Sequence, residues 1–387
     1  MSSSPFYDFD TPVDRRGTGS EKWDKYRGKD VLPLWVADMD FTSPPEIIRA
    51  LRQRVEHGVF GYGAPPAELA PAIRDYLAAE YGWEVAPDGL VWLPGLASGL
   101  HLACRAAGNE GDGVIVCPPI YPPFLAAPRR AGRALISVPL RQRDGRWEHD
   151  LAALEQAVTL RSRLLMLCHP HNPVGRVYGR EELTAVADFA RQHDLIVCSD
   201  EIHCDLILDA DKRHVPFAAL GADAAQRSIT LMAPSKTFNL PGLGFSFAVI
   251  PNAELRQRFR AVMAGIVPPV NIFGFVAAKA AYREGAAWRR ALLDYLRQNR
   301  AAVTAAVAAL PGLAMVPPQA TYLAWIDARG LGLADPARFF EEAGVGLSDG
   351  KDFGAAGYVR LNFGCPRSTL EEALRRIAQA IGGRRGR

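Results

Sequence analysis

The sequence has little net charge and no long apolar run. Its 387 residues carry 45 Lys and Arg against 42 Asp and Glu, a formal net charge of +3. So small an excess produces no strong field to attract nucleic acid or an anionic membrane. No apolar run reaches the roughly 18 residues that a membrane helix needs, and residues 1–14 lack the apolar core of a signal peptide. We therefore expect neither nucleic acid nor a membrane as a partner.

Cysteine is also scarce, and its spacing excludes a disulfide scaffold. The six cysteines are scattered without a Cys-x-x-Cys pair, and several sit in apolar runs. Such cysteines are typical of buried, reduced thiols in a reducing compartment, so we expect a cytoplasmic protein. The hydrophobic fraction of 49% and the charged fraction of 22% are those of a packed globular chain. The length predicts two domains.

Short apolar runs alternate with amphipathic segments through the middle of the chain. Runs that are apolar on both faces fit a parallel sheet covered on both sides, which indicates an α/β fold. Helical patterns lie between them at residues 150–158, with Asp150 as N-cap, and at residues 180–193. The predicted strands are residues 114–117, 134–138, 163–168, 195–199, 229–232 and 245–250.

The pattern changes after about residue 285. A long helix over residues 286–310 is followed by strands at 321–326 and 358–363 and helices at 336–343 and 369–381, a compact α+β module. We therefore predict a large domain over 46–285 and a small domain over 286–387. Residues 1–45, rich in Asp, Gly, Pro and Trp, are expected to pack on the small domain or on a partner subunit.

Lys236 follows a strongly apolar strand and precedes the loop signal Pro241-Gly242. A lysine at the mouth of a buried sheet is dehydrated, which lowers the pKa of its amine and makes it nucleophilic, as a Schiff base requires. A solvated loop lysine is the plainer interpretation.

Asp200 ends an apolar strand, where α/β sheets place their ligands. A buried carboxylate there needs a cationic partner, and a protonated pyridine nitrogen would serve. A helix-capping role is the alternative. A metal site built from Cys198, Asp200, His203 and Cys204 lacks a firm spacing signature, and His169-Pro170-His171 is no better as a ligand pair.

Three more motifs follow successive strands. Asn172, between two prolines, offers an amide donor to a phenolate oxygen. The turn 94–100 presents helix N–H groups and the Ser98 hydroxyl as an anion site. Tyr121, stiffened by prolines, can stack on a planar ring. The alternatives are a plain turn for Asn172, a tight glycine turn for residues 94–100 and core packing for Tyr121. The five motifs taken together describe one pocket.

These motifs resemble the fold-type I pyridoxal 5′-phosphate (PLP) enzymes of the aspartate aminotransferase superfamily, over nearly the whole chain. Within it the chain is most similar to the cystathionine β-lyase-like C–S lyase branch. The blocks that carry the likeness are residues 9–24, 34–41, 61–63, 199–205 and 235–239, and the first two are specific to that branch. The resemblance implies a mainly parallel seven-stranded sheet in the large domain and a smaller α+β domain.

The resemblance also implies roles around the PLP ring. Lys236 would form the Schiff base and then shuttle protons, while Asp200 would pair with the pyridine nitrogen. Asn172 would bond the phenolic oxygen and Tyr121 would stack on the ring. His203 stands beside the phenolic oxygen, where many relatives have tyrosine and the lyase branch has histidine.

Further residues would hold the PLP phosphate and the substrate. The Ala97 N–H, Ser98 and Ser235 would bind the phosphate. Tyr62 and Lys236 are the two candidate catalytic residues. Tyr62 would reach the phosphate from the neighbouring subunit, so a homodimer with shared active sites is implied. Arg360 would clamp the substrate α-carboxylate, although a strand-edge arginine is the plainer interpretation.

One departure concerns the phosphate grip. Gly244, eight residues after Lys236, replaces the basic phosphate ligand of many aminotransferases. The grip is therefore expected to depend more on the helix N-terminus, on Ser235 and on Tyr62 of the other subunit.

The predicted function is β-elimination from cystathionine or a related L-cysteine S-conjugate, giving a thiol, pyruvate and ammonia. The same lysine serves transamination, so a class I/II aminotransferase of an L-amino acid is the alternative. A non-catalytic sensor that keeps the fold is a third hypothesis, and the presence of both Lys236 and Arg360 disfavours it.

Overall fold

The computed structural model describes residues 7–385, without the side chains of residues 384–385. Residues 1–6 of the segment considered for a signal peptide lie outside the described residues. Within the described part of the chain, no helix combines the length and the apolar character needed to cross a bilayer.

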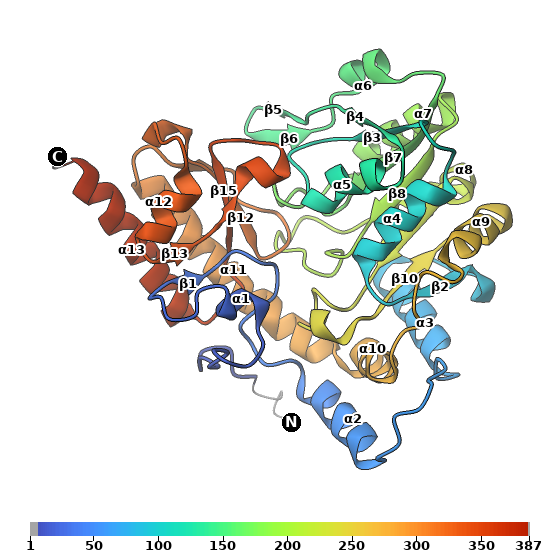
Figure 1. The fold of residues 1–387 in the computed structure, drawn as a ribbon, viewed down its shortest axis with the longest axis horizontal. Coiled ribbons are helices and arrows are strands. Elements are labelled where there is room, and N and C mark those ends of the chain that lie inside the picture. The colour runs from blue at the N-terminus through green and yellow to red at the C-terminus, as the bar shows by residue number, and fades with distance from the viewer. Residues whose placement is uncertain (1–6, 386–387) are drawn as a thin grey trace.

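A seven-stranded sheet forms the centre of the larger lobe (Figure 1). Six of its strands run in one direction and β10 runs against both of its neighbours. The α/β class and the mainly parallel seven-stranded sheet are thus confirmed. In spatial order the strands are β2 (Leu90–Leu93), β10 (Ser246–Val249), β9 (Ser228–Met232), β8 (Ile196–Asp200), β7 (Ser162–Cys168), β3 (Gly113–Val116) and β4 (Ala134–Ser137).

Alternation along the strands explains why these runs are apolar throughout. In β7, Leu164 and Met166 pack into one core cluster, whereas Leu165 and Leu167 pack into another on the opposite face. Helices cover both faces, as parallel strands require. The first cluster includes side chains of α4 (Leu96–Ala106), α5 (Pro122–Arg130) and α9 (Ala253–Met263), and the second includes side chains of α6 (Leu151–Ala157), α7 (Arg180–Gln192) and α8 (Ala222–Gln226).

The predicted boundaries of these elements agree with the structure to within one or two residues, and Asp150 caps α6 by accepting from the Ala153 N–H. The direction of β10 was not foreseen. A parallel connection needs a crossover of a dozen or more residues, usually a helix. Residues 233–245, between β9 and β10, instead form the loop that carries Lys236.

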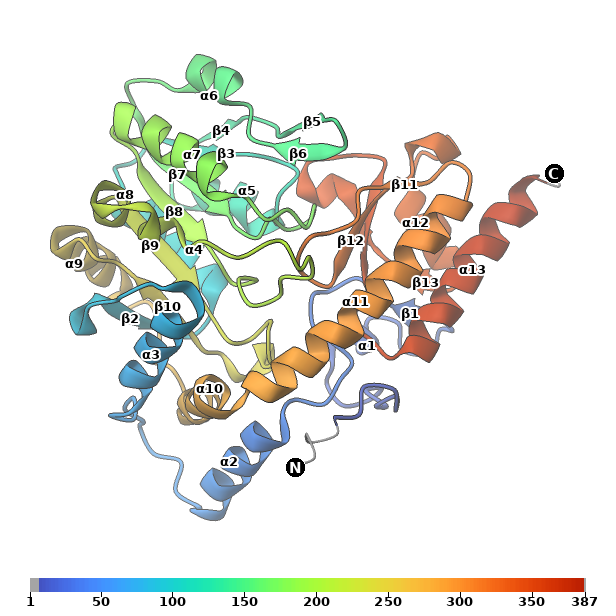
Figure 2. The same ribbon diagram turned by 180° about the vertical axis from the view of Figure 1, so that it is seen from behind.

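The smaller lobe is built on an antiparallel four-stranded sheet (Figure 2). Its order is β11 (Ala314–Met315), β12 (Leu323–Asp327), β15 (Tyr358–Asn362) and β14 (Ser348–Asp349). The helices α11 (Ala286–Ala309), α12 (Pro336–Glu342) and α13 (Arg367–Arg385) accompany it. Strand β12 starts two residues later than predicted, because Thr321 has a positive φ of 73°. The last helix is longer than predicted at both ends.

The N-terminal segment joins this smaller lobe. Strand β1 (Leu32–Pro33) pairs in parallel with β13 (Val345–Gly346), which fits the expected packing of residues 1–45. The segment also holds a helix that the periodicity did not indicate, α1 (Glu21–Asp24), which Ser20 caps. The domain divisions at 45/46 and 285/286 remain predictions.

The remaining elements cover the edges of the large sheet or extend away from it. Figure 1 shows α2 at the foot of the molecule, joined to α3 by a long exposed connection. The remaining elements are α2 (Pro45–Glu56), α3 (Leu69–Tyr81), α10 (Ile272–Glu284) and the hairpin β5 (Arg141–Arg143) and β6 (Arg146–Glu148).

All six cysteines are buried and unpaired, as expected for reduced thiols.

Candidate active site

A cavity of about 350 Å³ lies at the carboxyl edge of the large sheet. The segments that follow β2, β3, β7 and β9 reach it, together with the last residue of β8. Parallel strands place their ligands at this edge, which explains why motifs far apart in sequence meet here. Of the predicted site residues, the cavity is lined by Ala97, Tyr121, Asn172, Asp200, His203, Ser235, Lys236 and Arg360. Ser98 and Tyr62 do not line it.

Lys236 is the basic group at the centre of the site. Its Nζ donates to the Ala37 carbonyl at 2.5 Å. Burial lowers the pKa of this amine to about 8, with the Arg360 charge acting in the same direction and the Asp38 and Asp200 carboxylates opposing it. A large fraction of the amine is therefore neutral near pH 8, as a nucleophile requires.

Asp200 is a carboxylate in need of a cation. It is 3% exposed and accepts one hydrogen bond at 3.1 Å, from the Ile202 N–H to Oδ1. Burial raises the pKa of this carboxyl to about 7, and the nearby Glu201 charge adds to the increase. A buried acid with so little compensation is stable as an anion only when a positive group faces it.

Arg360 and Asn172 are bonded to each other across the cavity. Arg360 Nη1 donates to Asn172 Oδ1 at 2.9 Å, and Nη2 donates to the Trp35 carbonyl at 2.8 Å. Arg360 Nε is buried without a partner among the described residues. Because the Asn172 oxygen is taken, its NH₂ group remains as the donor predicted from the sequence.

The start of helix α4 forms the anion-binding end of the cavity. Its N-cap, Gly95, has no side chain to satisfy the first N–H groups, and Leu96 and Ala97 line the cavity. Ser98 lies in the same first turn, beside these residues. Ser235 faces the cavity from the Lys236 loop.

Gly244 also lines the cavity, and its backbone explains why no basic ligand stands there. Its φ is +59°, in the left-handed region that favours glycine. A Cβ at this position would lie 3.0 Å from the Pro94 carbonyl oxygen. The phosphate grip must therefore come from other groups, as the sequence indicated.

His203 and Tyr121 complete the wall. His203 is 2% exposed, and its Nδ1 has no partner among the described residues. Burial holds the pKa of this imidazole well below its usual range, so the ring is neutral. Tyr121 precedes α5, and its backbone N–H donates to the Asn172 backbone carbonyl at 3.1 Å, which joins the two segments that line the cavity here.

Residues 35–41 form a strap beside the cavity whose role the sequence analysis missed. Val36 and Ala37 line the cavity, and the Ala37 carbonyl also accepts from Tyr322 Oη at 3.0 Å. The strap therefore binds both Lys236 and Arg360 through backbone carbonyls. The block 34–41 had been singled out for the resemblance alone, and nothing in its spacing indicated these contacts.

A buried ion cluster holds the strap in place. Lys22 is fully buried, with its Nζ 2.7 Å from Asp40 Oδ2. Arg15 bridges Asp38 and Asp40 at 2.7 Å each, and the Trp23 indole donates to Asp40 at 2.9 Å. Such a network fixes the N-terminal segment to the strap.

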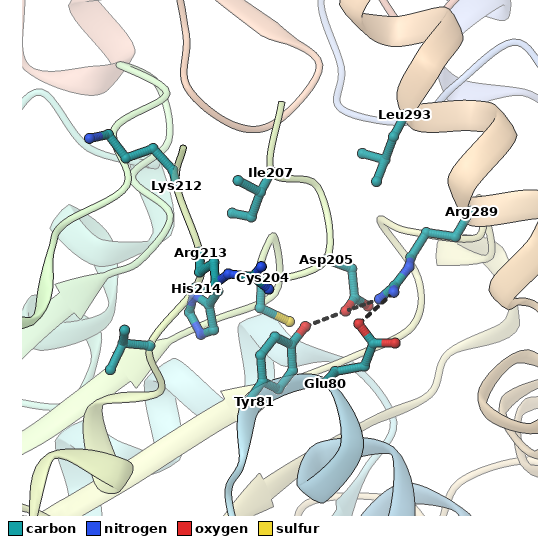
Figure 3. Close-up of a pocket in the computed structure, with 11 residues that line it drawn as sticks. Glu80, Tyr81, Cys204, Asp205, Ile207, Lys212, Arg213, His214, Arg289 and Leu293 are labelled. Carbon is teal, nitrogen blue, oxygen red and sulfur yellow. Dashed lines mark hydrogen bonds and ion pairs between the residues drawn. The ribbon is translucent and has the colours of Figure 1, made fainter. Parts of the chain in front are cut away.

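A second network lies behind the active-site wall and was also missed. Asp205 accepts from Thr237 Oγ1 at 3.0 Å and from Arg289 Nη1 at 3.0 Å. Figure 3 shows Arg289 reaching from α11 to Asp205 and Glu80, next to Tyr81, which also donates to Asp205. Because Thr237 follows Lys236 directly, Asp205 anchors the lysine loop to both lobes.

Tyr62 lies far from this chemistry in its own chain. It is fully exposed, on the connection between α2 and α3. Val59 and Phe60, more than half exposed, stand beside it. An exposed stretch with this many apolar side chains is typical of a protein–protein interface.

The chain is similar to known proteins over nearly its full length. A model of the family described as aminotransferase class I and II matches residues 29–377. The chain belongs to this family. Cystathionine beta-lyase PatB from Bacillus subtilis (strain 168) is 39% identical over 385 residues, which cover 96% of this chain and 99% of the relative.

Solved structures are also similar to this chain over nearly its full length. The crystal structure of OvoB has a TM-score of 0.95 at 52% identity and covers 97% of this chain and 99% of its own. Cystalysin from Treponema denticola, described as containing a pyridoxal 5′-phosphate cofactor, has a TM-score of 0.93 at 33% identity and covers 98% and 100%. The predicted fold-type I PLP family, its cystathionine β-lyase-like branch and the PLP cofactor are confirmed.

The residues present fit PLP. The cavity offers an amine of lowered pKa at Lys236, a buried carboxyl of raised pKa at Asp200, and helix N–H groups without a side-chain cap at the start of α4. These match an aldehyde, a pyridinium nitrogen and a phosphate.

Proposed function

We propose that this protein is a PLP-dependent C–S β-lyase that acts on L-cysteine S-conjugates such as cystathionine. The joint placement of Lys236, Asp200 and Arg360 in one cavity supports PLP chemistry on an amino acid. Because transamination would use the same residues, the choice of β-elimination rests on the relatives named as lyases. The cystathionine β-lyase and C–S lyase relatives support the same enzyme class. The cytoplasmic location remains a prediction.

The chain's own residues divide the work. PLP, when bound, supplies an aldehyde for amines and a ring that takes up an electron pair from Cα. Arg360 binds the substrate α-carboxylate through its free Nε, and the Lys236 amine, once released, removes the Cα proton. Asp200 would balance the ring nitrogen and Asn172 would donate to the ring oxygen, while Tyr121 and His203 would hold the ring in place.

The phosphate is held at the start of α4. In the proposal it accepts from the Ala97 N–H, from Ser98 and from Ser235, and from Tyr62 of a second subunit. The full exposure of Tyr62 supports this role, because in its own chain nothing in the described residues covers the ring. The protein is then a homodimer in which each subunit completes the other's site.

The reaction balances without an external oxidant. The Cα proton goes to Lys236, the Cβ–S bond breaks and the thiolate leaves with the bonding pair. The three-carbon remainder takes up one water and gives pyruvate and ammonium, while the thiolate takes a proton. Transamination uses the same residues, but it needs a keto acid to restore the cofactor.

The test separates these two reactions. Purified protein is mixed with L-cystathionine, and pyruvate is measured with and without 2-oxoglutarate. A lyase releases pyruvate without the keto acid, and the variant Lys236→Ala releases none. Glutamate that forms only with 2-oxoglutarate, with no pyruvate in its absence, would make the protein an aminotransferase instead.

A further inference from the structure

A second cavity adjoins the active-site cavity. It measures about 760 Å³ and shares Val36, Tyr121 and Arg360 with the active-site cavity. We call it the annex. Its other lining residues come mainly from α1, the start of α5, α12 and the segment after β13: Glu21, Lys25, Trp35, Pro122, Pro123, Asp335, Ala337, Arg338, Glu341, Leu347, Ser348, Asp349, Asp352 and Phe353.

Arg360 stands at the junction of the two cavities. It is 4% exposed, packs 4.7 Å above the Phe353 ring, and has a buried Nε without a partner among the described residues. An unpaired guanidinium N–H at this depth calls for an anion. A substrate α-carboxylate bound there, with the amino group towards Lys236, leaves the annex for the group beyond sulfur.

The annex carries an excess of acid. Five of its lining residues are carboxylates, whereas Lys25 and Arg338 are the cations besides Arg360. Arg338 is already engaged, with its Nε 2.9 Å from Glu342, which is outside the annex. Lys29 and Lys351 lie 3.6–3.9 Å from Glu341, Asp335 and Asp349 and offset those three in part.

Two of the carboxylates are exposed and have no ion-pair partner among the described residues. Glu21 and Asp352 form no ion pair with any described residue, and they line the annex from α1 and from the turn before Phe353. The Trp35 ring already holds a cation, since the Lys25 ammonium lies 4.6 Å from its ring centre. The unpaired carboxylates of Glu21 and Asp352 are therefore the groups left in the annex to receive a cation from the substrate.

We propose that the annex receives the leaving group of the substrate and selects thiols whose far end is positively charged. The proposal rests on the lyase function proposed above and names its substrate class: L-cysteine S-conjugates with a cationic substituent. Glu21 and Asp352 are the specificity-determining residues.

Three conjugates of similar size test the proposal. S-(2-aminoethyl)-L-cysteine carries a distal cation, S-propyl-L-cysteine is neutral and S-carboxymethyl-L-cysteine carries a distal anion. We expect kcat/KM for pyruvate release to be about tenfold higher for the cationic than for the neutral conjugate, lower still for the anionic one, and the spread to shrink in high salt. Calorimetric binding to the Lys236→Ala variant is expected to follow the same order.

The double variant Glu21→Gln/Asp352→Asn should bring the cationic-to-neutral ratio close to one. Glu254→Gln is the matched control, because Glu254 is also an exposed acid in the first turn of a helix and lies outside the annex. It should leave the ratio unchanged.

The outcomes separate the two proposals. Equal cleavage of all three conjugates would overturn the annex assignment and leave the lyase function intact, as would a preference that the double variant retains. Absence of pyruvate from every conjugate would overturn the lyase function itself.

Discussion

Burial of single charged groups prepares this site for its cofactor. Lys236 and Asp200 both line the same cavity, and burial shifts the pKa of each towards the neutral form. Each shift carries a free-energy cost that a complementary group can recover. A bound cofactor with an aldehyde and a protonated ring nitrogen relieves both groups together.

The first prediction concerns the pH dependence of cofactor attachment. The Lys236 pKa of about 8 means that the amine is protonated and unreactive below that pH. We expect the rate at which PLP attaches to cofactor-free protein to rise about tenfold per pH unit up to about pH 8 and then to level off. The growth of the yellow colour measures it. Free Nα-acetyl-lysine, the control, should continue to gain reactivity above pH 8, and a protein rate that does the same would contradict the lowered pKa.

The second prediction concerns Asp200→Asn. An amide cannot balance a positive ring nitrogen, so we expect kcat for pyruvate release to fall by about 10²-fold or more. The cofactor should still attach, because Lys236 is intact. Absorbance gives the cofactor content and the pyruvate assay gives kcat. Asp223→Asn, at an exposed helical position, is the control, and full activity of the Asp200 variant would show that its charge is not used.

At the scale of elements, the lysine loop is anchored by a buried charge. Asp205 accepts from Thr237 and Arg289, and so joins the loop after β9 to helix α11. Removal of the Asp205 charge leaves Arg289 with Glu80 as its one carboxylate partner among the described residues. The loop and the helix are therefore expected to loosen together.

The third prediction follows for Asp205→Asn. We expect the free energy of unfolding to fall by about 2–3 kcal/mol, because Arg289, only 9% exposed, loses one of its two carboxylate partners. Urea unfolding monitored by circular dichroism measures it. The control is Asp223→Asn, which breaks the more exposed Asp223–Arg227 pair and should cost less than about 1 kcal/mol. Equal losses in the two variants would show that burial of Asp205 has no special weight.

Elements could be predicted from the sequence more fully than contacts. Six of the seven strands of the large sheet were predicted, because their residues are apolar on both faces, whereas β2 was not. The motifs after the strands were placed at one edge because parallel strands end together. The strap contact was not found, because Lys236 and Ala37 are 199 positions apart and the acceptor is a backbone carbonyl. The Asp205 network was missed for the same reason, since its partners lie on α3, α11 and the lysine loop.

At the scale of the whole molecule, buried histidines make the fold sensitive to acid. Burial lowers the pKa of His149 and His214 to about 3 and that of His171 to about 4, and it also lowers those of His169 and His203. The unfolded chain takes up protons at these groups from about pH 6.5 downward, whereas the folded chain does not. The pKa values of Asp200 and Glu201 are raised to about 7, so these two carboxyls make the fold more stable as the pH falls. The five histidines outnumber them.

The fourth prediction is that stability falls as the pH decreases from about 6.5 towards 4. The urea midpoint should drop steadily across this window and stay nearly level between pH 7 and 8. His171→Asn should reduce the slope, and His57→Asn, at an exposed position, should leave it unchanged. A urea midpoint that does not change between pH 6.5 and 4.5 would contradict the predicted loss of stability in acid.

The fifth prediction concerns the proposed dimer. The variants Tyr62→Ala and Lys236→Ala should each have little activity, Tyr62→Ala because the phosphate loses a donor and Lys236→Ala because the base is gone. If Tyr62 acts across the interface, a mixed dimer has one subunit with an intact Lys236 facing an intact Tyr62. Co-refolded equal amounts should then recover about a quarter of the wild-type activity, since half of the dimers are mixed and each has one complete site.

The same mixture distinguishes action within a subunit from action between subunits. If Tyr62 served its own chain, no mixed dimer would contain a complete site and the activity would stay at the sum of the two variants. Mixing Tyr62→Ala with Tyr62→Ala at the same total concentration controls for refolding. Sedimentation checks that dimers form, because the exposed Val59 and Phe60 beside Tyr62 are expected to be covered in the dimer. Activity of the mixture above the sum of the two variants therefore requires an active site built from two chains.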